Sequence, residues 1–554
     1  MVRKTVIFLV ILLATYAAFA AEQVILRVGM QDEPITLNPF YARDVWSWNV
    51  LGLIYESLYG YNPDLELIPM LADGNPETDV EAGTAIVHLK EGITWSDGSA
   101  LTAHDVAFTA QVIQHFQFPT LYYRFEFIKD VEVMDEYTLR YHLDTEALGA
   151  GMTPIFETDT LTNFVVQKKQ WKSVFEDALR QRDPLNWFVA QAPQPVGCGP
   201  YTYNEWLHGS YIYLARNESY YATGMEIDEQ RVGPYVDGIL FNIYRTTDLA
   251  SLALKKGNLD YMFWSIPPGF IEDLEKDPDI TVHRNPSNGF FYLAFNLREG
   301  PWSDNALRTA LTTLVDRETI AERILWSLGE PLYTVVPPGN EYWHNPEVQT
   351  PGKGLSTTER LDQAKAILSE AGYSWANGSL VLPDGSAAPG LEILVPPADY
   401  DPVRDKTAGL ITVWFNQLGL KVRKRNISFA ELVTTVFDER DFEAYVLGWG
   451  LSPDPDHVRI FFHSKYDVPG GFNCTGYQDP QFDELAQQSM ITNDATKRRE
   501  IIFTLQEILA EDLPYLPIYS LEVIEARANR FTGWVDQLGG IGNYWSFVLA
   551  KPVK

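Results

Sequence analysis

The chain has 554 residues and is acidic, with 74 aspartates and glutamates against 43 lysines and arginines and a formal net charge of −31. So negative a protein does not bind nucleic acid or anionic membranes through general electrostatics. Its two cysteines, Cys198 and Cys474, can be paired or free. Neither the cysteines nor the nine scattered histidines have the spacing of metal ligands, so we expect no metal and no other cofactor.

The first 20 residues predict a signal peptide. Arg3 and Lys4 precede the apolar run 6–13, and the tripeptide 18–20 has the small-x-small form of a cleavage site. The apolar run is too short for a convincing membrane span, and no cysteine lies near the cleavage site to carry a lipid. We therefore expect a periplasmic or secreted protein that is not inserted in the membrane.

Strands and helices alternate along the chain up to about residue 290, which indicates α/β layers. Residues 24–30 predict a strand, and 44–58 carry an apolar stripe at helical spacing. Thr102 and Asp105 form a capping box, and Asp97 belongs to an Asp-Gly turn, so we interpret both acids as structural. The other elements expected here are strands at 84–90, 201–206, 211–217, 239–244 and 259–263, a hairpin at 131–143 and a helix at 248–256.

The alternation continues after residue 290 without repeats, low-complexity tracts or a long linker. This continuity predicts interwoven domains, of which the length suggests about three or four. The expected strands are 290–297, 391–395, 421–426 and 516–520, and the expected helices are 304–314, 319–328, 358–371, 405–418, 480–489 and 494–509.

The stretch 442–462 reads FEAYVLGWGLSPDPDHVRIFF and organises the second half of the chain. A hydrophobic strand at 445–447 is expected to break at Gly448-Trp449-Gly450, where glycines let a ligand approach the backbone and Trp449 offers a flat apolar face. On its own the stretch is more typical of a strand and a surface turn with Trp449 in the core. The aromatic content of 13% exceeds the needs of a core and suggests a binding cleft for sugars or peptides. The rest of the chain, through the family resemblance of its other segments, favours a ligand-facing loop.

A set of segments in a fixed order also carries a family signal. They are IYESL at 54–58, LKEGITWSDG at 89–98 with LTAHDV at 101–106, GCGPY at 197–201, FN at 295–296, the helix of Arg308 with DRE at 316–318, the helix 364–372, GW at 448–449 with DP at 454–455, GY at 476–477 with FD at 482–483, and LPIY at 516–519. Together they resemble the extracytoplasmic solute-binding proteins of the dipeptide/oligopeptide class, the receptors of ABC importers. The resemblance spans nearly the whole mature chain.

The resemblance implies an α/β, two-lobed periplasmic-binding-protein fold of the large, three-domain type, with the ligand cleft between the lobes. It places domain I at 21–59, 192–287 and 513–554 and domain II at 60–191, which together form one lobe. Domain III at 288–512 forms the other lobe. The chain is expected to cross between the lobes near Asn288 and near Leu513.

One position departs from the peptide-binding members of the family. In those relatives an aspartate three residues after the Gly-Trp tryptophan binds the α-amino group of the peptide. Here that position is Ser452, whose neutral hydroxyl cannot bind an ammonium group as a carboxylate does. Asp454 and Asp456 can substitute, but their positions match a common turn of the family. The departure favours a neutral ligand such as an oligosaccharide over a peptide with a free amino group.

Sugar binding needs aromatic platforms and planar polar groups, although core packing is the alternative for each aromatic residue. The candidate ligand-binding residues are the platforms Trp46, Trp48, Trp264, Trp343 and Trp449, the polar residues Asn296, Asn473, Ser452 and Asp454, and Gly448 and Gly450 beside the tryptophan.

The sequence therefore predicts a monomeric receptor without catalytic residues, which closes on a ligand and delivers it to an ABC permease with its ATPases. The expected ligands, in declining order, are an oligosaccharide, a peptide and a metal chelate. The alternative is an exported glycan-active hydrolase. A glycosidase needs two positioned carboxylates, and the chain has no GxSxG, HExxH or P-loop motif, so we do not expect an enzyme.

Overall fold

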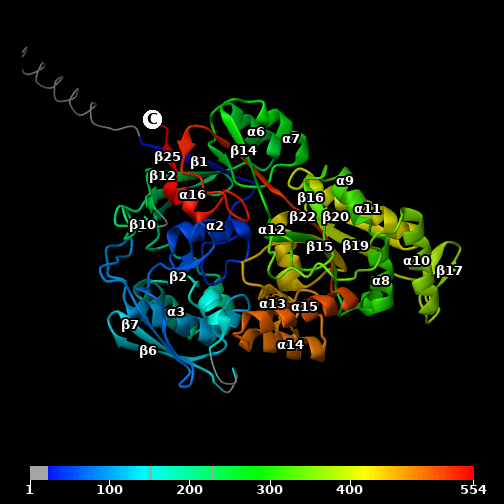
Figure 1. The fold of residues 1–554 in the computed structure, drawn as a ribbon, viewed down its shortest axis with the longest axis horizontal. Coiled ribbons are helices and arrows are strands. Elements are labelled where there is room, and N and C mark those ends of the chain that lie inside the picture. The colour runs from blue at the N-terminus through cyan, green and yellow to red at the C-terminus, as the bar shows by residue number, and fades with distance from the viewer. Residues whose placement is uncertain (1–22, 146–147, 149–151, 228, 554) are drawn as a thin grey trace, which may run out of the picture.

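The structure, a computed structural model, describes residues 23–145, 148, 152–227 and 229–553 (Figure 1). The predicted signal peptide at 1–20 lies outside these residues. Among the helices that are described, none is long and apolar enough to span a bilayer. The fold is α/β with two lobes, each built on a large mixed sheet. Lobe one comprises the described residues before β15 and after β22, and lobe two comprises the part from β15 to β22.

Lobe one is built on a seven-stranded sheet of order β14-β23-β13-β1-β12-β9-β8. Its central strand β1 (Ile25–Met30) is parallel to both neighbours, β12 (Gly238–Ile243) and β13 (Tyr261–Met262). The side chains of Leu26 and Val28 lie on one face of this strand and are fully buried in the core. The outer strands are β8 (Tyr201–Leu207), β9 (Tyr211–Arg216), β14 (Ile280–Asn285) and β23 (Val523–Ala528), and the helices are α2 (Val45–Ile54), α6 (Thr247–Lys255), α7 (Pro268–Glu275) and α16 (Tyr544–Leu549).

A second sheet of four strands, in the order β4-β5-β7-β6, extends lobe one. Helix α3 (Ala103–Phe116) begins at the predicted capping box of Thr102 and Asp105, and Asp105 also accepts the backbone N–H of Lys168 at 2.8 Å, which confirms its structural role. The apolar core of this sheet is continuous with that of the larger sheet. The remaining elements here are β4 (Glu77–Asp79), β5 (Thr84–His88), β6 (Ile128–Asp135), β7 (Thr138–Leu143), η1 (Tyr122–Arg124), η2 (Phe156–Thr160), α4 (Lys168–Ala178) and α5 (Pro184–Val189). Lobe one also contains small two-stranded sheets, namely β2 (Tyr59–Tyr61) with β3 (Leu67–Pro69), β10 (Glu226–Ile227) with β11 (Gln230–Arg231), and β24 (Phe531–Thr532) with β25 (Lys551–Pro552).

Lobe two is built on a six-stranded sheet of order β16-β22-β15-β21-β19-β20, with a separate apolar cluster on each face. Strand β19 (Gly390–Val395) is parallel to β20 (Lys421–Asn426) and to β21 (Ala444–Gly450), so the carboxyl ends of these strands lie at one edge. The other strands are β15 (Gly289–Phe295), β16 (Gly329–Pro331) and β22 (Tyr515–Leu521), with a separate hairpin of β17 (Ser374–Ala376) and β18 (Ser379–Val381). The α-helices are α8 (Asn305–Leu314), α9 (Arg317–Arg323), α10 (Thr357–Glu370), α11 (Pro402–Gln417), α12 (Phe429–Val433), α13 (His457–Ile460), α14 (Pro480–Ile491) and α15 (Ala495–Asp512). Short helices of other types are η3 (Gly300–Ser303), η4 (Thr434–Glu439) and η5 (Ser464–Tyr466).

Two connections join the lobes and lie side by side. One runs from β14 to β15 through Asn288, and the other joins β22 to β23 at Glu522. They are adjacent because β14 pairs with β23 in lobe one and β15 pairs with β22 in lobe two. The second crossing was predicted near Leu513, which precedes β22, and the sheet pairing places it at Glu522. The domain boundaries themselves stay predictions.

Two elements differ from the sequence prediction. Strand β21 continues through the glycines to Gly450, where a break was expected, because Gly448 leaves room for its neighbour: a Cβ there would lie 2.7 Å from the ring of Phe291. Helix α9 ends at Arg323 and does not reach residue 328, since Trp326 and Ser327 take φ angles of 53° and 63°, in the left-handed region.

The two cysteines are free and lie in different cores. Cys198 is buried in the core of lobe one and Cys474 in that of lobe two. Burial raises the pKa of Cys474 to about 12 and the pKa of Cys198 well above its usual value. Both residues are therefore neutral, apolar side chains of the interior at physiological pH.

Candidate ligand-binding site between the lobes

The loops that follow β19 and β21 leave the sheet of lobe two at one edge and reach lobe one. After β19, the backbone carbonyl of Tyr400 accepts the side-chain N–H of Gln31 at 2.8 Å, and its hydroxyl accepts Nε1–H of Trp46 at 3.3 Å. After β21, Arg459 donates to Glu126 of lobe one at 2.8 Å. Ligands of α/β proteins commonly bind outside the carboxyl ends of parallel strands, so this boundary is the candidate site.

A cavity of about 170 Å³ lies at this boundary. Lobe one contributes Gln31 and the segment 264–268, and lobe two contributes Phe291 and the segment 400–403. The ring of Tyr400 is held by Phe429, on which it stacks with centroids 5.5 Å apart and planes 13° apart. Of the tryptophans predicted to bind the ligand, Trp264 is the one that lines this cavity.

Trp449 packs mainly within lobe two. Its ring is half-buried and stacks on Phe461 with a centroid distance of 4.4 Å, and the rings of Phe437 and Phe472 meet it edge-on. Its Nε1–H is buried close to the hydroxyl of Tyr515 without the geometry of a hydrogen bond to any described atom. The segment reaches the boundary through its neighbours, since Phe472 contacts the ring of Tyr123 of lobe one at 5.9 Å.

The segment after Trp449 presents no free carboxylate. Ser452 is exposed, and its backbone carbonyl accepts the side-chain N–H of Asn288 at 2.8 Å. Asp454 forms two hydrogen bonds with Arg498, at 2.6 and 2.7 Å. Asp456 is buried and paired with a second arginine of lobe two. Neither aspartate is therefore available to replace the missing carboxylate at position 452 without breaking an ion pair.

Glu126 is the centre of an ion-pair cluster that joins the lobes. Its Oε1 accepts from Arg459 and from Lys465 of lobe two, both at 2.8 Å, and from the hydroxyl of Tyr466 at 3.1 Å. The guanidinium of Arg459 is fully buried and also bonds Asp456 at 2.7 Å. A second pair across the boundary joins Arg43 of lobe one to Asp438 of lobe two, where Nη1 donates to Oδ1 and Nη2 donates to Oδ2.

Arg124 lies beside this cluster and has a different environment. Its Nε donates to the hydroxyl of Tyr123 at 3.0 Å, and the guanidinium forms no ion pair with any carboxylate in the described part of the chain. The neighbouring Asp159 is buried and accepts hydrogen bonds from Thr158 and Tyr123. The pKa of Asp159 is raised to about 6, mainly by burial and also by the carboxylates of Asp456 and Asp454 across the boundary, while Arg124 acts to lower it.

The remaining predicted residues lie away from the cavity. Trp48 packs against Phe164 in lobe one at 5.5 Å, and the ring of Trp343 lies under the guanidinium of Arg498 in lobe two at 5.3 Å. Asn296 and Asn473 are buried and use their side-chain amides on backbone groups: Asn296 donates to Phe442 at 3.1 Å, and Asn473 donates to Tyr477 at 2.8 Å. These amides hold loops of lobe two in place.

Sequence reasoning missed several residues at the boundary, namely Gln31, Glu126, Arg124, Asp159, Phe291 and Tyr400. One signal was available for Tyr400, because it follows a buried strand in a loop that is rich in proline and aspartate, 396–402. The others come from separate elements of both lobes, and only the tertiary structure brings them together.

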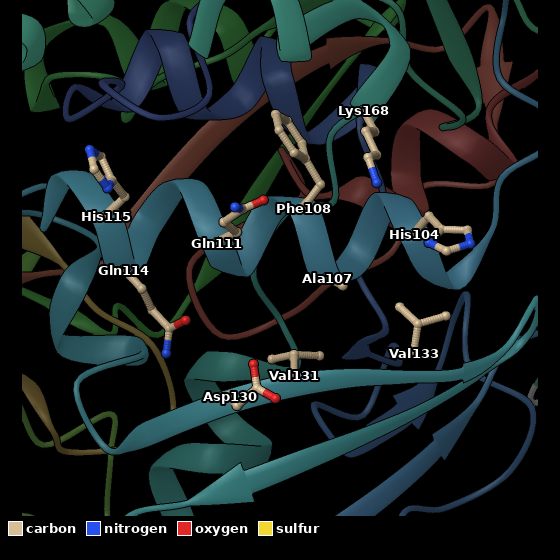
Figure 2. A pocket seen from close by; sticks show the side chains of 10 residues that line it. All are labelled: His104, Ala107, Phe108, Gln111, Gln114, His115, Asp130, Val131, Val133 and Lys168. Carbon is tan, nitrogen blue, oxygen red and sulfur yellow. The ribbon is translucent and has the colours of Figure 1, made fainter. Parts of the chain in front are cut away.

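A larger hollow of about 480 Å³ lies elsewhere, between α3 and β6 of lobe one (Figure 2). His104 and His115 point from opposite ends of α3. No group of three or more potential ligand side chains that could hold a metal ion occurs among the described residues. All residues of this hollow belong to lobe one, so it does not respond to movement of the lobes.

Comparison with known proteins places these features in a family. The family described as "Bacterial extracellular solute-binding proteins, family 5 Middle" matches residues 66–468. The oligopeptide-binding protein AppA of Bacillus subtilis (strain 168) is 26% identical over 499 residues, which cover 89% of this chain and 86% of AppA. The glutathione-binding protein GsiB of Shigella flexneri is 23% identical over 529 residues, which cover 94% of this chain and 93% of GsiB.

Solved structures have the same fold. The structure of AppA from Bacillus subtilis in complex with a nonapeptide matches with a TM-score of 0.83 and 23% identity, and the match covers 96% of this chain and 100% of AppA. The periplasmic oligopeptide-binding protein of Thermotoga maritima with bound mannohexaose matches with a TM-score of 0.78 and 21% identity, covering 96% and 99% of the two chains. Proteins of this fold thus bind chemically different solutes.

Proposed function

The chain belongs to the bacterial extracellular solute-binding proteins, family 5, and we propose that it is the receptor of an ABC importer. In this proposal the exported monomer captures a solute between its lobes and delivers it to the permease. It uses no metal, cofactor or catalytic residue. The cleaved signal peptide at 1–20 is part of the proposal.

The observation that supports this function best is a cavity lined by both lobes, together with the ion pairs that join the lobes. The cavity is lined by Trp264 from lobe one and by Phe291 and Tyr400 from lobe two, and it exists only when the lobes meet. A solute that contacts both lobes binds the closed form more tightly than the open form, and this difference shifts the population to the closed form. Capture therefore requires binding and movement but no chemistry.

We propose a peptide as the ligand, which reverses the order suggested by the sequence. AppA is named an oligopeptide-binding protein and GsiB a glutathione-binding protein, and both match nearly the whole chain. Arg124, with its guanidinium free of carboxylate partners at the boundary, suits the terminal carboxylate of a peptide.

An oligosaccharide is the second candidate. The stretch Gly448, Trp449, Gly450 and Ser452 offers a flat ring and a neutral hydroxyl, and Asp454 beyond it is paired with Arg498. A relative of this fold binds mannohexaose. An exported glycan-active hydrolase has no support from the family and is not proposed.

A thermal-shift screen tests the proposed function. Pools of two- to five-residue peptides and pools of α- and β-linked oligosaccharides are each added to the mature protein. We expect the peptide pools to raise the unfolding midpoint, because a ligand at 100 times its Kd adds about 2.7 kcal/mol to the free energy of unfolding.

A shift with oligosaccharides alone would reject the peptide and select the second candidate. The same samples are analysed for new products by mass spectrometry, and turnover of any pool would contradict a receptor without catalysis.

A further inference from the structure

The cavity at the lobe boundary is small, and its size limits the group that fits. Its volume is about 170 Å³. A cavity of about 150 Å³ with apolar walls holds one benzene ring. One aromatic or branched aliphatic side chain therefore fills this cavity, and two such groups do not fit.

Three aromatic rings border the cavity and are fixed by their own packing. The ring of Phe291 stacks on Tyr519 with centroids 4.8 Å apart, and the ring of Tyr400 stacks on Phe429. Trp264 follows β13 and packs against the apolar clusters of lobe one. Aliphatic side chains complete the wall, namely Ile266, Leu328, Val403, Leu521 and Ile524. The wall is preorganised for an apolar group.

Most polar groups of the wall already have partners. Gln31 donates to the backbone of Tyr400 at 2.8 Å, Ser265 accepts the N–H of Ile524 at 3.2 Å, and Asp401 caps α11 by accepting the N–H of Arg404 at 2.8 Å. A sugar ring carries several hydroxyls, and most of them would find no partner here. The residues that line the cavity also include no lysine, arginine or histidine to neutralise an acidic side chain.

One donor of the wall differs from these groups. The Nε1–H of Trp264 is buried and has no hydrogen-bond partner within the described part of the chain. A buried donor without a partner carries a cost that a ligand oxygen removes. A peptide has a carbonyl oxygen next to every side chain, so one residue can supply both the apolar group and the acceptor.

We propose that this cavity binds one aromatic or branched aliphatic side chain of a peptide ligand and that Trp264 donates its Nε1–H to a carbonyl oxygen beside that side chain. The inference rests on the proposed function and adds the class of side chain that the receptor selects. It predicts that peptides with an acidic or small polar residue at this position bind weakly.

Four pools of tetrapeptides test the inference. Each pool contains alanine peptides with one variable residue at every position in turn, and this residue is Phe, Leu, Ser or Asp. Dissociation constants are measured by isothermal titration calorimetry. We expect the Phe and Leu pools to bind wild-type protein at least roughly tenfold more tightly than the Ser and Asp pools, the scale expected for burying one such side chain.

Two variants of the tryptophan separate its two roles. Trp264→Phe keeps a ring and removes the donor, so it should weaken all pools by a similar factor. Trp264→Ala also opens the wall, so it should abolish the preference for Phe and Leu. Trp375→Ala, at a half-buried tryptophan in the hairpin of lobe two, is the matched control and should leave the preference unchanged. Unfolding midpoints without ligand show that each variant is folded.

The outcomes separate this inference from the function on which it rests. If wild-type protein binds all four pools equally, or if Trp264→Ala keeps the preference, the side-chain site is wrong while a peptide receptor stands. If no pool binds, the peptide class fails and the inference fails with it.

Discussion

At the scale of single residues, Arg124 lies at the boundary near Asp159 but forms no ion pair with a carboxylate in the described part of the chain. The chain has 74 acidic and 43 basic residues, so a guanidinium without a carboxylate partner is unexpected on simple counting. The buried arginines nearby, Arg459 and Arg498, are each paired with an aspartate of lobe two. A free guanidinium in this position suits a ligand that carries a carboxylate, which it can bind through two parallel hydrogen bonds.

Arg124→Met tests this role by removing the charge while keeping most of the side-chain length. We expect peptides with a free terminal carboxylate to bind the variant roughly tenfold to a hundredfold more weakly, as is usual for the loss of a charge-assisted hydrogen bond. Peptides with a terminal amide should bind wild type and variant alike. Arg182→Met, at an exposed position of the same lobe, is the control. An unchanged preference for the free carboxylate in Arg124→Met would remove Arg124 from the site.

Sequence reasoning identified residue types better than it identified contacts. It predicted the capping box of Asp105 from a local pattern, and the structure confirms it. The missing carboxylate at Ser452 is a prediction that rests on the resemblance to peptide-binding relatives. The sequence did not indicate that Asp454 is paired with Arg498 or that the side-chain amides of Asn296 and Asn473 donate to backbone carbonyls. Asp454 and Arg498 are 44 residues apart and Asn296 and Phe442 are 146 apart, so tertiary packing sets their proximity. Asn473 and Tyr477 are four residues apart, and their contact depends on the conformation of one loop.

At the scale of elements, the loop after η1 and helix α13 form a contact that exists only between closed lobes. Glu126 follows η1 in lobe one, and its carboxylate lies among Arg459, Lys465 and Tyr466 of lobe two. Opening the lobes would remove Glu126 from the buried Arg459, which would keep Asp456 and the hydroxyl of Tyr466 as its partners within lobe two. The cluster therefore stabilises the closed form and contributes to ligand affinity without touching the ligand.

Glu126→Gln tests this coupling by removing the charge with little change of shape. Loss of one partner from a buried ion pair is costly, so we expect ligand affinity to fall by roughly tenfold or more. The unfolding midpoint without ligand should change little, since the open form does not use the contact. Glu132→Gln, which disrupts an exposed pair with Arg140 within lobe one, should change neither quantity. Equal affinities for Glu126→Gln and wild type would show that the cluster does not favour closure.

Alternating apolar residues predicted the strands correctly, but the predicted end of β21 was wrong. Glycines usually interrupt strands, and that expectation led to a predicted break after Leu447. In the sheet, Gly448 lies against the ring of Phe291 and the strand continues to Gly450. A neighbour from the adjacent strand determined the outcome, and the local sequence could not indicate it.

At the scale of the whole molecule, two adjacent connections allow the lobes to move as units. The chain crosses at Asn288 and at Glu522, and each lobe has its own sheet and core. The family, the fold and the two lobes were predicted from an ordered set of short segments that spans the chain. The location of the cavity was not predictable, because residues from both lobes form it and no single segment carries its pattern.

The central claim is that the lobes close on a ligand, and the distance between them tests it most directly. Cysteines introduced at Lys172 of lobe one and Lys497 of lobe two, both exposed, accept a pair of fluorescent dyes, while the native Cys198 and Cys474 are buried. Single-molecule energy transfer is then recorded with and without a saturating amount of the tightest-binding tetrapeptide pool. We predict that the ligand shifts the population to one short distance; an identical distance distribution with and without bound ligand would contradict the account.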